Sequence, residues 1–430
     1  MDRRLFLLSG LAGVADPVSP VLKAVAPAPA PLTRSGDDKF DAWAQAFFAR
    51  AIGAGWPDAV VRRQLEGLTP DPLVIAADRK QPEFTRSIGD YMHAAVSDGR
   101  VATGRQKQAE MAAWLDMIET RFGVAGPILV GIWALESGFG VAQGDFDVVR
   151  SLATLAADGR RRDWAEGELL ATVRIVATGQ ARREQLKGSW AGAMGQTQLE
   201  PTEFVSHAVD IDGDGKPDLW GSPPDALGSS ANILAAAGWV RGTSWAREVL
   251  LPAGFDYSVT EGPRNPPAWW TALGVRRADG ADWNAADAAQ PCQLIAPAGA
   301  AGPAFLVLPN HFVIRKYNNS TSYALAVGLM ADGVAGAPAL STAWPVEAPI
   351  SQADRTGAQA ALIKLGFDAG DVDGVIGTKT RAALRAWQAS RKLVADGHLT
   401  AQLAATLQLE AGGAAPAPTP APVAPPAATP

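Results

Sequence analysis

Hydrophobic residues recur every three or four positions along most of the chain, which predicts a mainly helical protein. One helical region runs from about Asp37 to Gly138. Further helical patterns lie at 152–157, at 164–177, before Gly238 and at 323–330. Between 250 and 315 the chain is richer in Pro and Gly, and its short apolar runs at 305–308 and 312–314 indicate small strands.

The segment 126–140 (GPILVGIWALESGFG) contains a helix with one acidic residue. Pro127 suits a first helical position, and Gly138 and Gly140 suit a helix end. Glu136 shares a face with Ile128 and Ile132, so we expect burial to raise its pKa, as for a general acid. The alternative is an ordinary helix-end Glu that pairs with an arginine such as Arg150.

Changes in composition divide the chain into five parts. Residues 1–26 precede a Pro/Ala linker at 27–34, and a first large domain is expected at 35–345. A compact helical unit is expected at 350–410, and an Ala/Pro tail at 411–430 is predicted to be disordered.

The first part is typical of an export signal. Arg3 and Arg4 precede an apolar run that is too short to span a bilayer, and the pair resembles a twin-arginine signal. Cleavage is expected after Ala15 or near Ala26. No Cys follows this run and no other stretch is long and apolar enough to span a membrane, so we expect a periplasmic protein without a membrane anchor.

Charge and cysteine content exclude two classes of function. The net charge is −6 and no long basic run occurs, which argues against nucleic acid as a partner. The single Cys292 rules out an internal disulfide and a cysteine-rich metal site.

A second motif, 188–201 (GSWAGAMGQTQLEP), places three glycines among small residues, where a backbone could approach a ligand closely. Together with the Glu136 segment it resembles the lysozyme-like lytic transglycosylases, most closely the lytic murein transglycosylase B family. The likeness covers roughly residues 35–335. It continues in the following segments: 81–84 (QPEF), 151–156 (SLATLA), 159–162 (GRRR), 225–232 (DALGSSAN), 237–239 (AGW) and 317–326 (YNNSTSYALA).

The resemblance implies an α+β lysozyme-like catalytic domain with small β elements and a single catalytic acid. Glu136 would protonate the β-1,4 oxygen between N-acetylmuramic acid and N-acetylglucosamine, aided by the 2-acetamido group. The Glu136 carboxylate would then take the C6-hydroxyl proton, so that a 1,6-anhydro ring forms without water. No cofactor is needed for these steps.

The same resemblance assigns supporting residues. Ser189 and Gln198 would position the sugar, Tyr317 and Asn318 would orient the acid and the intermediate, and Tyr323 would support the pocket. The chain departs from the family at Ile233, where a Tyr is usual, so a contact to the sugar is lost there or supplied elsewhere. Trp190 and Trp220 are candidates for a stacking face.

The segment 210–218 (DIDGDGKPD) is typical of a calcium loop. Asp210, Asp212 and Asp214 occupy positions 1, 3 and 5 of an EF-hand, and Lys216 would contribute its carbonyl at position 7. Position 12 is a glycine, so Asp225 is expected to close the ring. The alternative is a solvated acidic turn; the calcium ion, if bound, is predicted to be structural.

The C-terminal unit carries helix-face patterns on both sides of a glycine-punctuated loop. Its segments 359–367 (QAALIKLGF), 373–377 (DGVIG) and 380–388 (TRAALRAWQ) resemble the three-helix peptidoglycan-binding domain of wall hydrolases. The resemblance implies tethering to peptidoglycan; a unit that only packs on the catalytic domain is the alternative.

Two other functions compete with the lytic transglycosylase. One is a lysozyme-type hydrolase that uses Glu136 and water with help from Asp145 or Asp147. The other is a non-catalytic scaffold that binds the cell wall. The sequence identifies no protein partner.

Overall fold

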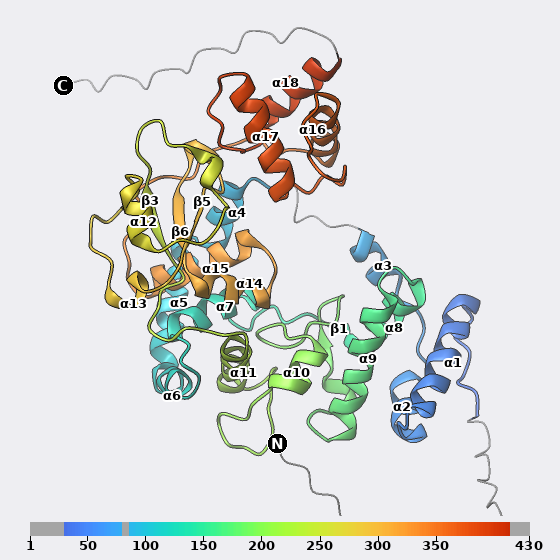
Figure 1. Ribbon diagram of the computed structural model, residues 1–430. Helices are drawn as coiled ribbons and strands as arrows, with labels where there is room; N and C mark the ends of the chain where they lie inside the picture. The colour runs from blue at the N-terminus through green and yellow to red at the C-terminus, as the bar shows by residue number, and fades with distance from the viewer. Residues whose placement is uncertain (1–29, 80–85, 413–430) are drawn as a thin grey trace, which may run out of the picture.

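The computed structural model describes residues 30–79 and 86–412 and consists mainly of helices (Figure 1). The expected export signal 1–26, the linker residues 27–29, the segment 81–84 and the tail residues 413–430 lie outside the described residues. The helices are α1 Asp38–Gly53, α2 Asp58–Leu65, α3 Pro72–Arg79, α4 Ile88–Ala95, α5 Asp98–Glu110, α6 Ala112–Phe122, α7 Gly126–Ser137, α8 Val148–Asp158, α9 Arg162–Ala177, α10 Pro201–His207, α11 Pro223–Ala236, α12 Pro267–Ala272, α13 Ala285–Ala288, α14 Pro309–Tyr317, α15 Thr321–Val334, α16 Gln352–Lys364, α17 Thr378–Ser390 and α18 Ala401–Gly412. The strands are β1 Phe146–Asp147, β2 Lys187–Gly188, β3 Ala246–Leu250, β4 Arg276–Arg277, β5 Gln293–Ile295 and β6 Ala304–Val307.

One hydrophobic core is built by α1, α2, α8, α9 and the loop around Leu199. Helix α1 packs beside α8, and α2 beside α9, although these pairs are far apart in sequence (Figure 1). The predicted helices at 152–157 and 164–177 are confirmed as α8 and α9. The predicted linker differs: Leu32 is buried in this core, and its backbone is bonded to the Gln45 side chain at 3.2 and 3.0 Å.

A second core surrounds α7, whose neighbours include α5, α6, α11 and α15. The predicted helix 127–138 is confirmed, with a proline in its first turn and a left-handed C-cap at Gly138 (φ 57°). The sequence analysis placed Ile128 and Ile132 on one apolar face of this helix. The structure instead buries α7 on nearly all sides. Helix α15 crosses it so closely that a Cβ on Gly131 would lie 2.7 Å from the Val327 carbonyl oxygen.

A four-stranded antiparallel sheet, in the order β4-β3-β6-β5, covers one end of this second core. Phe305 and Val307 of β6 face the α7 core, whereas Leu306 faces a smaller cluster that includes Trp270. The predicted strand at 305–308 is therefore confirmed. The predicted strand at 312–314 is wrong, because Pro309 begins helix α14 and the β-branched residues there lie on its buried side.

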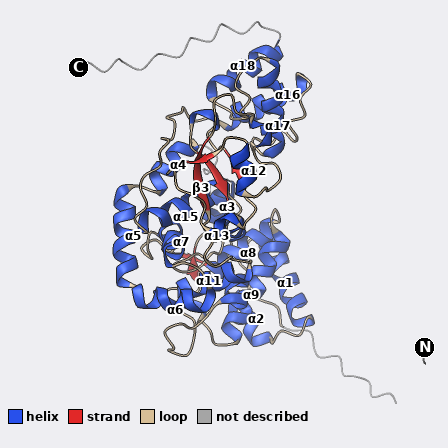
Figure 2. Ribbon diagram, turned by 60° about the vertical axis from the view of Figure 1, so that its left-hand side comes forward, coloured by secondary structure: helices blue, strands red, loops and turns tan. Residues whose placement is uncertain are grey.

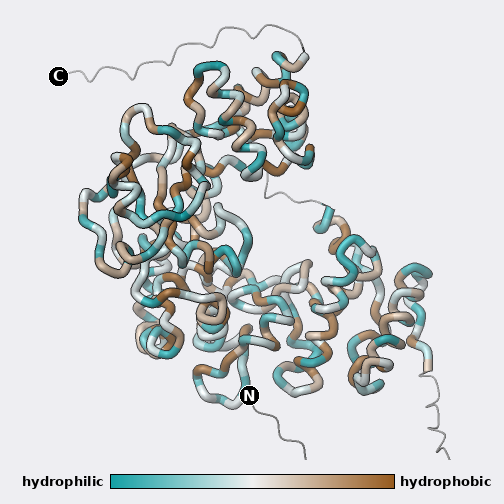
Figure 3. Tube along the Cα trace, in the orientation of Figure 1, coloured by the Kyte–Doolittle hydropathy of each residue, from teal (hydrophilic) through white to brown (hydrophobic). Residues whose placement is uncertain are grey.

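Helices α16, α17 and α18 form a separate core around Leu362, Leu384 and Trp387. This unit lies at one end of the molecule in both ribbon views (Figures 1 and 2). Helix α18 extends to Gly412, so residues 411 and 412 belong to the unit and not to the tail. Hydrophobic and hydrophilic residues alternate along its helices (Figure 3), as three amphipathic helices around one core require.

Within the described residues, no single helix is long and apolar enough to cross a membrane. The bent pair α6 and α7, which meet at 110°, passes such a test together on length and composition alone. Their apolar residues form part of the second core.

Candidate active site

Glu136 lies in the last turn of α7 and is half-buried. The hydroxyl of Tyr323, in the first turn of α15, donates to Glu136 Oε1 at 2.6 Å. Burial and the neighbouring Glu136 charge raise the pKa of Tyr323 well above its ordinary value, so this tyrosine is a neutral donor. The expected shift in the pKa of Glu136 stays a prediction.

Tyr317, at the end of α14, packs against both cores and so lies at their junction. Its hydroxyl donates to the Thr197 carbonyl oxygen at 2.6 Å, which can only accept, and lies 3.1 Å from Ser230 Oγ. Burial and the nearby Glu136 charge raise the pKa of Tyr317. The Tyr317 hydroxyl proton is therefore used to hold the loop that follows Gly195.

Two residues that the sequence analysis left without a role fasten the Glu136 helix to that loop. Ser137 Oγ donates to the Gln196 carbonyl oxygen at 2.5 Å and accepts from Gly140 N at 2.8 Å. Gln196 Oε1 accepts from Trp133 Nε1 at 3.1 Å. Ser137 lies in the motif 126–140 and Gln196 in the motif 188–201, so the two motifs already pointed to these residues.

The glycines of the second motif approach the protein's own chain. A Cβ on Gly188 would clash with the Ala193 carbonyl oxygen, and a Cβ on Gly195 would lie 2.6 Å from the Leu219 carbonyl oxygen. The loop is tightly folded on itself through the bridges 188↔194 and 194↔199, and the expected close approach to a ligand stays a prediction.

Ser189 and Gln198 lie in this loop and are half-buried. Ser189 Oγ accepts from Ala193 N at 3.1 Å. Gln198 has a left-handed backbone (φ 51°), and its Nε2 donates to the carbonyl oxygens of Gln143 and Gly195, each at 2.9 Å. Their contacts to a sugar stay predictions.

The remaining predicted residues take different positions. Asn318 caps α14 and is exposed, next to the turn that leads to Tyr323. Ile233 is 8% exposed in the first core, so this position offers no hydroxyl. Trp190 and Trp220 are both half-buried, and Trp220 Nε1 donates to the Lys187 carbonyl oxygen at 2.8 Å.

The sequence analysis named Arg150 as an alternative ion-pair partner of Glu136, and Asp145 or Asp147 as a second acid. Arg150 bonds to the Thr69 and Pro70 carbonyl oxygens and pairs with Asp71 at 3.2 Å. Asp147 caps α8 and pairs with Arg183 at 2.8 Å. Asp145 is exposed.

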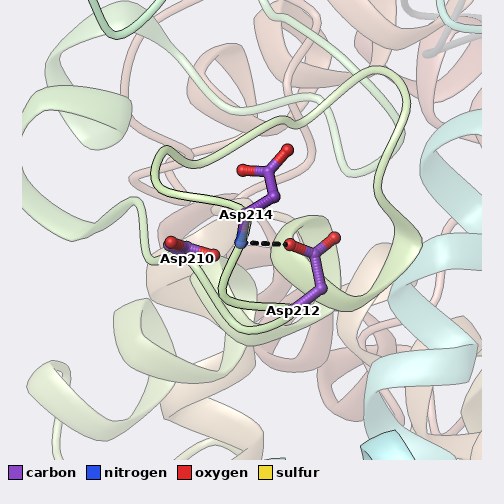
Figure 4. Close-up of side chains that lie close together, drawn as sticks. All are labelled: Asp210, Asp212 and Asp214. Carbon is purple, nitrogen blue, oxygen red and sulfur yellow. Dashed lines mark hydrogen bonds between the residues drawn. The ribbon is translucent and has the colours of Figure 1, made fainter.

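The acidic loop brings three carboxylates together. Single oxygens of Asp210, Asp212 and Asp214 lie within 4.8 Å of one another. Figure 4 shows these side chains around the loop, with Asp214 N donating to Asp212 Oδ1 at 3.2 Å. Asp225 is fully buried and accepts from Ile211 N at 2.7 Å and Asp218 N at 2.9 Å, so its observed contacts hold the loop's backbone.

A cavity of about 600 Å³ lies away from this site, between α5, β3, the end of α15 and residues 337–344. Its walls include Trp245, Asp332 and Trp344, and none of the motif residues above. This cavity is therefore not the candidate active site.

The helical fold and the clustered Glu136, Tyr317 and Tyr323 agree with the lysozyme-like transglycosylases that the sequence motifs resemble. The model of the family described as "Transglycosylase SLT domain" matches residues 39–332, and the chain belongs to this family. A peptidoglycan binding domain matches residues 351–407. The resemblance stated from sequence is thereby confirmed.

Individual relatives agree. Membrane-bound lytic murein transglycosylase B of Escherichia coli is 32% identical over 254 residues, which cover 56% of this chain and 64% of the relative's length. SltB3 from Pseudomonas aeruginosa, solved in complex with NAG-anhNAM-pentapeptide, is 44% identical with a TM-score of 0.83, over 86% of this chain and all of that one. Escherichia coli Slt35, solved in complex with calcium, is 27% identical with a TM-score of 0.59, over 68% of this chain and 92% of that one.

Proposed function

We propose that this protein is a lytic transglycosylase that cleaves the MurNAc-β-1,4-GlcNAc bond of peptidoglycan without water and leaves 1,6-anhydroMurNAc ends. The observation that carries the proposal is the placement of Glu136 beside Tyr323, on a helix end locked to the glycine-rich loop. Family membership and the similarity to SltB3, whose solved complex holds an anhydro-muropeptide, support it.

In this mechanism Glu136 acts first as an acid and then as a base. It gives a proton to the glycosidic oxygen, the 2-acetamido group supports the positive charge at C1, and the carboxylate then takes the proton of the C6 hydroxyl. Tyr323 orients the acid by its 2.6 Å hydrogen bond. Glu136 and the substrate supply every reacting group, so we propose that no cofactor takes part.

The decisive experiment is mass spectrometry of digested sacculi. The anhydro product is lighter by one water than the product of a lysozyme-type hydrolase, so the mass separates the two. Glu136→Gln should abolish release while the protein still binds sacculi. Unchanged release by this variant would exclude Glu136 as the acid, and an inactive wild-type protein would favour the scaffold.

We further propose that the α16–α18 unit holds the enzyme on peptidoglycan and raises the local substrate concentration. We also propose that the protein acts in the periplasm after export. The relatives named for murein support action outside the cytoplasm, and the signal residues themselves lie outside the described part of the chain.

A structural calcium site at the acidic loop is a separate proposal. Three close carboxylates repel one another and provide the hard oxygen ligands that Ca²⁺ prefers, and the complex of Slt35 with calcium supports the assignment. We propose that Asp210, Asp212, Asp214, the Lys216 carbonyl and Asp225 form the loop's ligand set, with Asp225 also bracing the backbone.

Calcium should therefore raise the thermal stability of the protein. At a hundredfold excess over Kd the gain is about 2.7 kcal/mol, measured as a shift in Tm between calcium and EDTA. Asp214→Asn should reduce this shift, whereas Asp282→Asn, at an exposed aspartate outside the loop, should leave it intact. The absence of any shift in the wild-type protein would contradict the site.

A further inference from the structure

A single glutamine, Gln143, ties the loop that follows Glu136 to two other segments of the site. Its Nε2 donates to the Gly140 carbonyl oxygen at 3.1 Å, within the same loop, and to the Trp220 carbonyl oxygen at 3.2 Å. Its backbone carbonyl oxygen accepts from Gln198 Nε2 at 2.9 Å. Gln143 therefore joins this loop to the segment before α11 and to the glycine-rich motif 188–201.

The backbone on both sides of this contact is constrained. Phe139 and Gln198 both have left-handed backbones, with φ of 63° and 51°, which residues other than glycine adopt at a cost. A Cβ on Gly144 would clash with the Gly188 carbonyl oxygen, so the loop lies directly against the glycine-rich motif. Strained backbone persists only where surrounding contacts hold it, and the hydrogen bonds of Gln143 are among those contacts.

The contacts of Gln198 decide which end of its amide can meet a substrate. An NH2 group has two N–H donors, and those of Gln198 go to the carbonyl oxygens of Gln143 and Gly195, each at 2.9 Å. Two neighbouring carbonyl oxygens require the amide nitrogen on that side, so the orientation of the amide is fixed. No described residue donates to Gln198 Oε1, and this oxygen is not among the enclosed atoms. Gln198 therefore offers a substrate an acceptor and no donor.

The side chain of Gln143 carries a cost that packing does not explain. Its Oε1 is buried, and no described donor reaches it. A buried acceptor without a donor lowers stability, and an apolar side chain of the same length would avoid this loss. Local costs of this kind are expected at functional sites, so the two donor contacts of Gln143 serve the site more than the stability of the fold.

We propose that Gln143 is a positioning residue for the transglycosylase reaction, and that it holds the amide of Gln198 with Oε1 toward the sugar. The inference rests on the proposed function, because the resemblance places Gln198 at the sugar and gives Gln143 no role. The Gln143 side chain fixes the loop, the loop fixes the Gln143 carbonyl, and this carbonyl takes one N–H of Gln198. Without these contacts the amide can turn, and the sugar is then misaligned with Glu136.

Gln143→Met tests the proposal, because it keeps the length of the side chain and removes both donors. We expect kcat for the release of anhydro products to fall about tenfold, with KM and Tm close to those of the wild type. In a Gln198→Ala background, which has no amide to position, Gln143→Met should have no further effect on kcat. Gln45→Met is the matched control, because Gln45 also donates to a carbonyl oxygen, that of Leu32 at 3.0 Å, but away from the site. It should lower Tm and leave kcat unchanged.

A second readout does not depend on the reaction. The two Nε2 protons of Gln198, assigned as the NMR amide pair that Gln198→Ala loses, should exchange with solvent slowly in the wild type and faster in Gln143→Met. Gln143→Glu has the same shape without the two donors, and serves as a second variant with the same expected result. Equal exchange in variant and wild type, an unchanged kcat, or a loss that adds to that of Gln198→Ala would each overturn the proposal. Wild-type products without the anhydro ring would contradict the proposed function instead, and the exchange result would still decide the role of Gln143.

Discussion

Tyr323 keeps its proton in contact with Glu136, since burial and the carboxylate hold its pKa well above the ordinary value for tyrosine. Tyr323→Phe keeps the buried ring and removes only this hydrogen bond. Loss of a hydrogen bond to a charged group costs about 1.5–3 kcal/mol, so kcat should fall roughly 10- to 100-fold. Steady-state release of anhydro products from sacculi measures this.

Tyr257→Phe is the control for that variant, because no described hydrogen bond uses its hydroxyl and it lies outside the site. It should retain full activity. Equal activity of Tyr323→Phe and wild type would show that Glu136 is oriented by other contacts.

At this scale the sequence identified single residues but not their pairing. Glu136 and Tyr323 are 187 residues apart, so no local pattern could join them. The resemblance named both, and it assigned Tyr317 to the acid and the intermediate, a role that stays a prediction. The structure bonds Tyr317 to Thr197, because the hydroxyl is enclosed where two cores meet.

Among the elements, the crossing of α7 and α15 fixes the position of Glu136. Gly131→Ala would place a Cβ 2.7 Å from the Val327 carbonyl oxygen, and backbone cannot move aside as a flexible side chain can. We expect a loss of about 1–3 kcal/mol in the free energy of unfolding, measured by denaturant titration. Gly167→Ala is the matched control: it lies within α9 with open space around it, and should stabilise by about 0.5–1 kcal/mol. A neutral Gly131→Ala would show that the crossing can relax.

A buried acid joins α9 to the start of α10. Glu168 accepts from Thr202 N at 2.9 Å and Thr202 Oγ1 at 2.7 Å, and burial together with Glu200 raises its pKa to about 7. The folded protein thus keeps a proton that the unfolded chain loses above about pH 4.5, so stability should fall between pH 4.5 and 7. Glu168→Gln, which cannot ionise, should flatten Tm in this range and raise it at pH 8. An unchanged pH profile would contradict this role.

Helix positions were predicted well because their apolar periodicity reflects burial, as α8, α9 and α15 show. The error at 312–314 arose where a short β-branched run outweighed Pro309, the helix-start signal. Short runs do not distinguish a strand from a buried helix, and packing against the second core decides.

On the scale of the whole molecule, the α16–α18 unit docks through a few polar contacts that no pattern in the sequence predicts. Arg381 and Arg385 approach Glu261 at 2.6 and 3.7 Å, and His398 pairs with Glu347 at 2.7 Å. The unit has its own core, so its helices were predictable from sequence. Its docked position depends on side chains that are 120 residues apart in the pair Arg381 and Glu261 and 51 apart in the pair His398 and Glu347.

Reversing one charge of this contact should release the unit. Glu261→Arg would face two arginines, so the protein should expand in small-angle scattering and lose activity on intact sacculi several-fold. Its rate on short, stemless strands should stay unchanged, because Tyr323 and the helix that carries Glu136 belong to another core. Adding Arg381→Glu should restore compactness in part, by a coupling of about 0.5–3 kcal/mol in a double-mutant cycle. If the single variant stays compact and fully active on sacculi, the remaining contacts, among them His398 with Glu347, hold the unit without this ion pair.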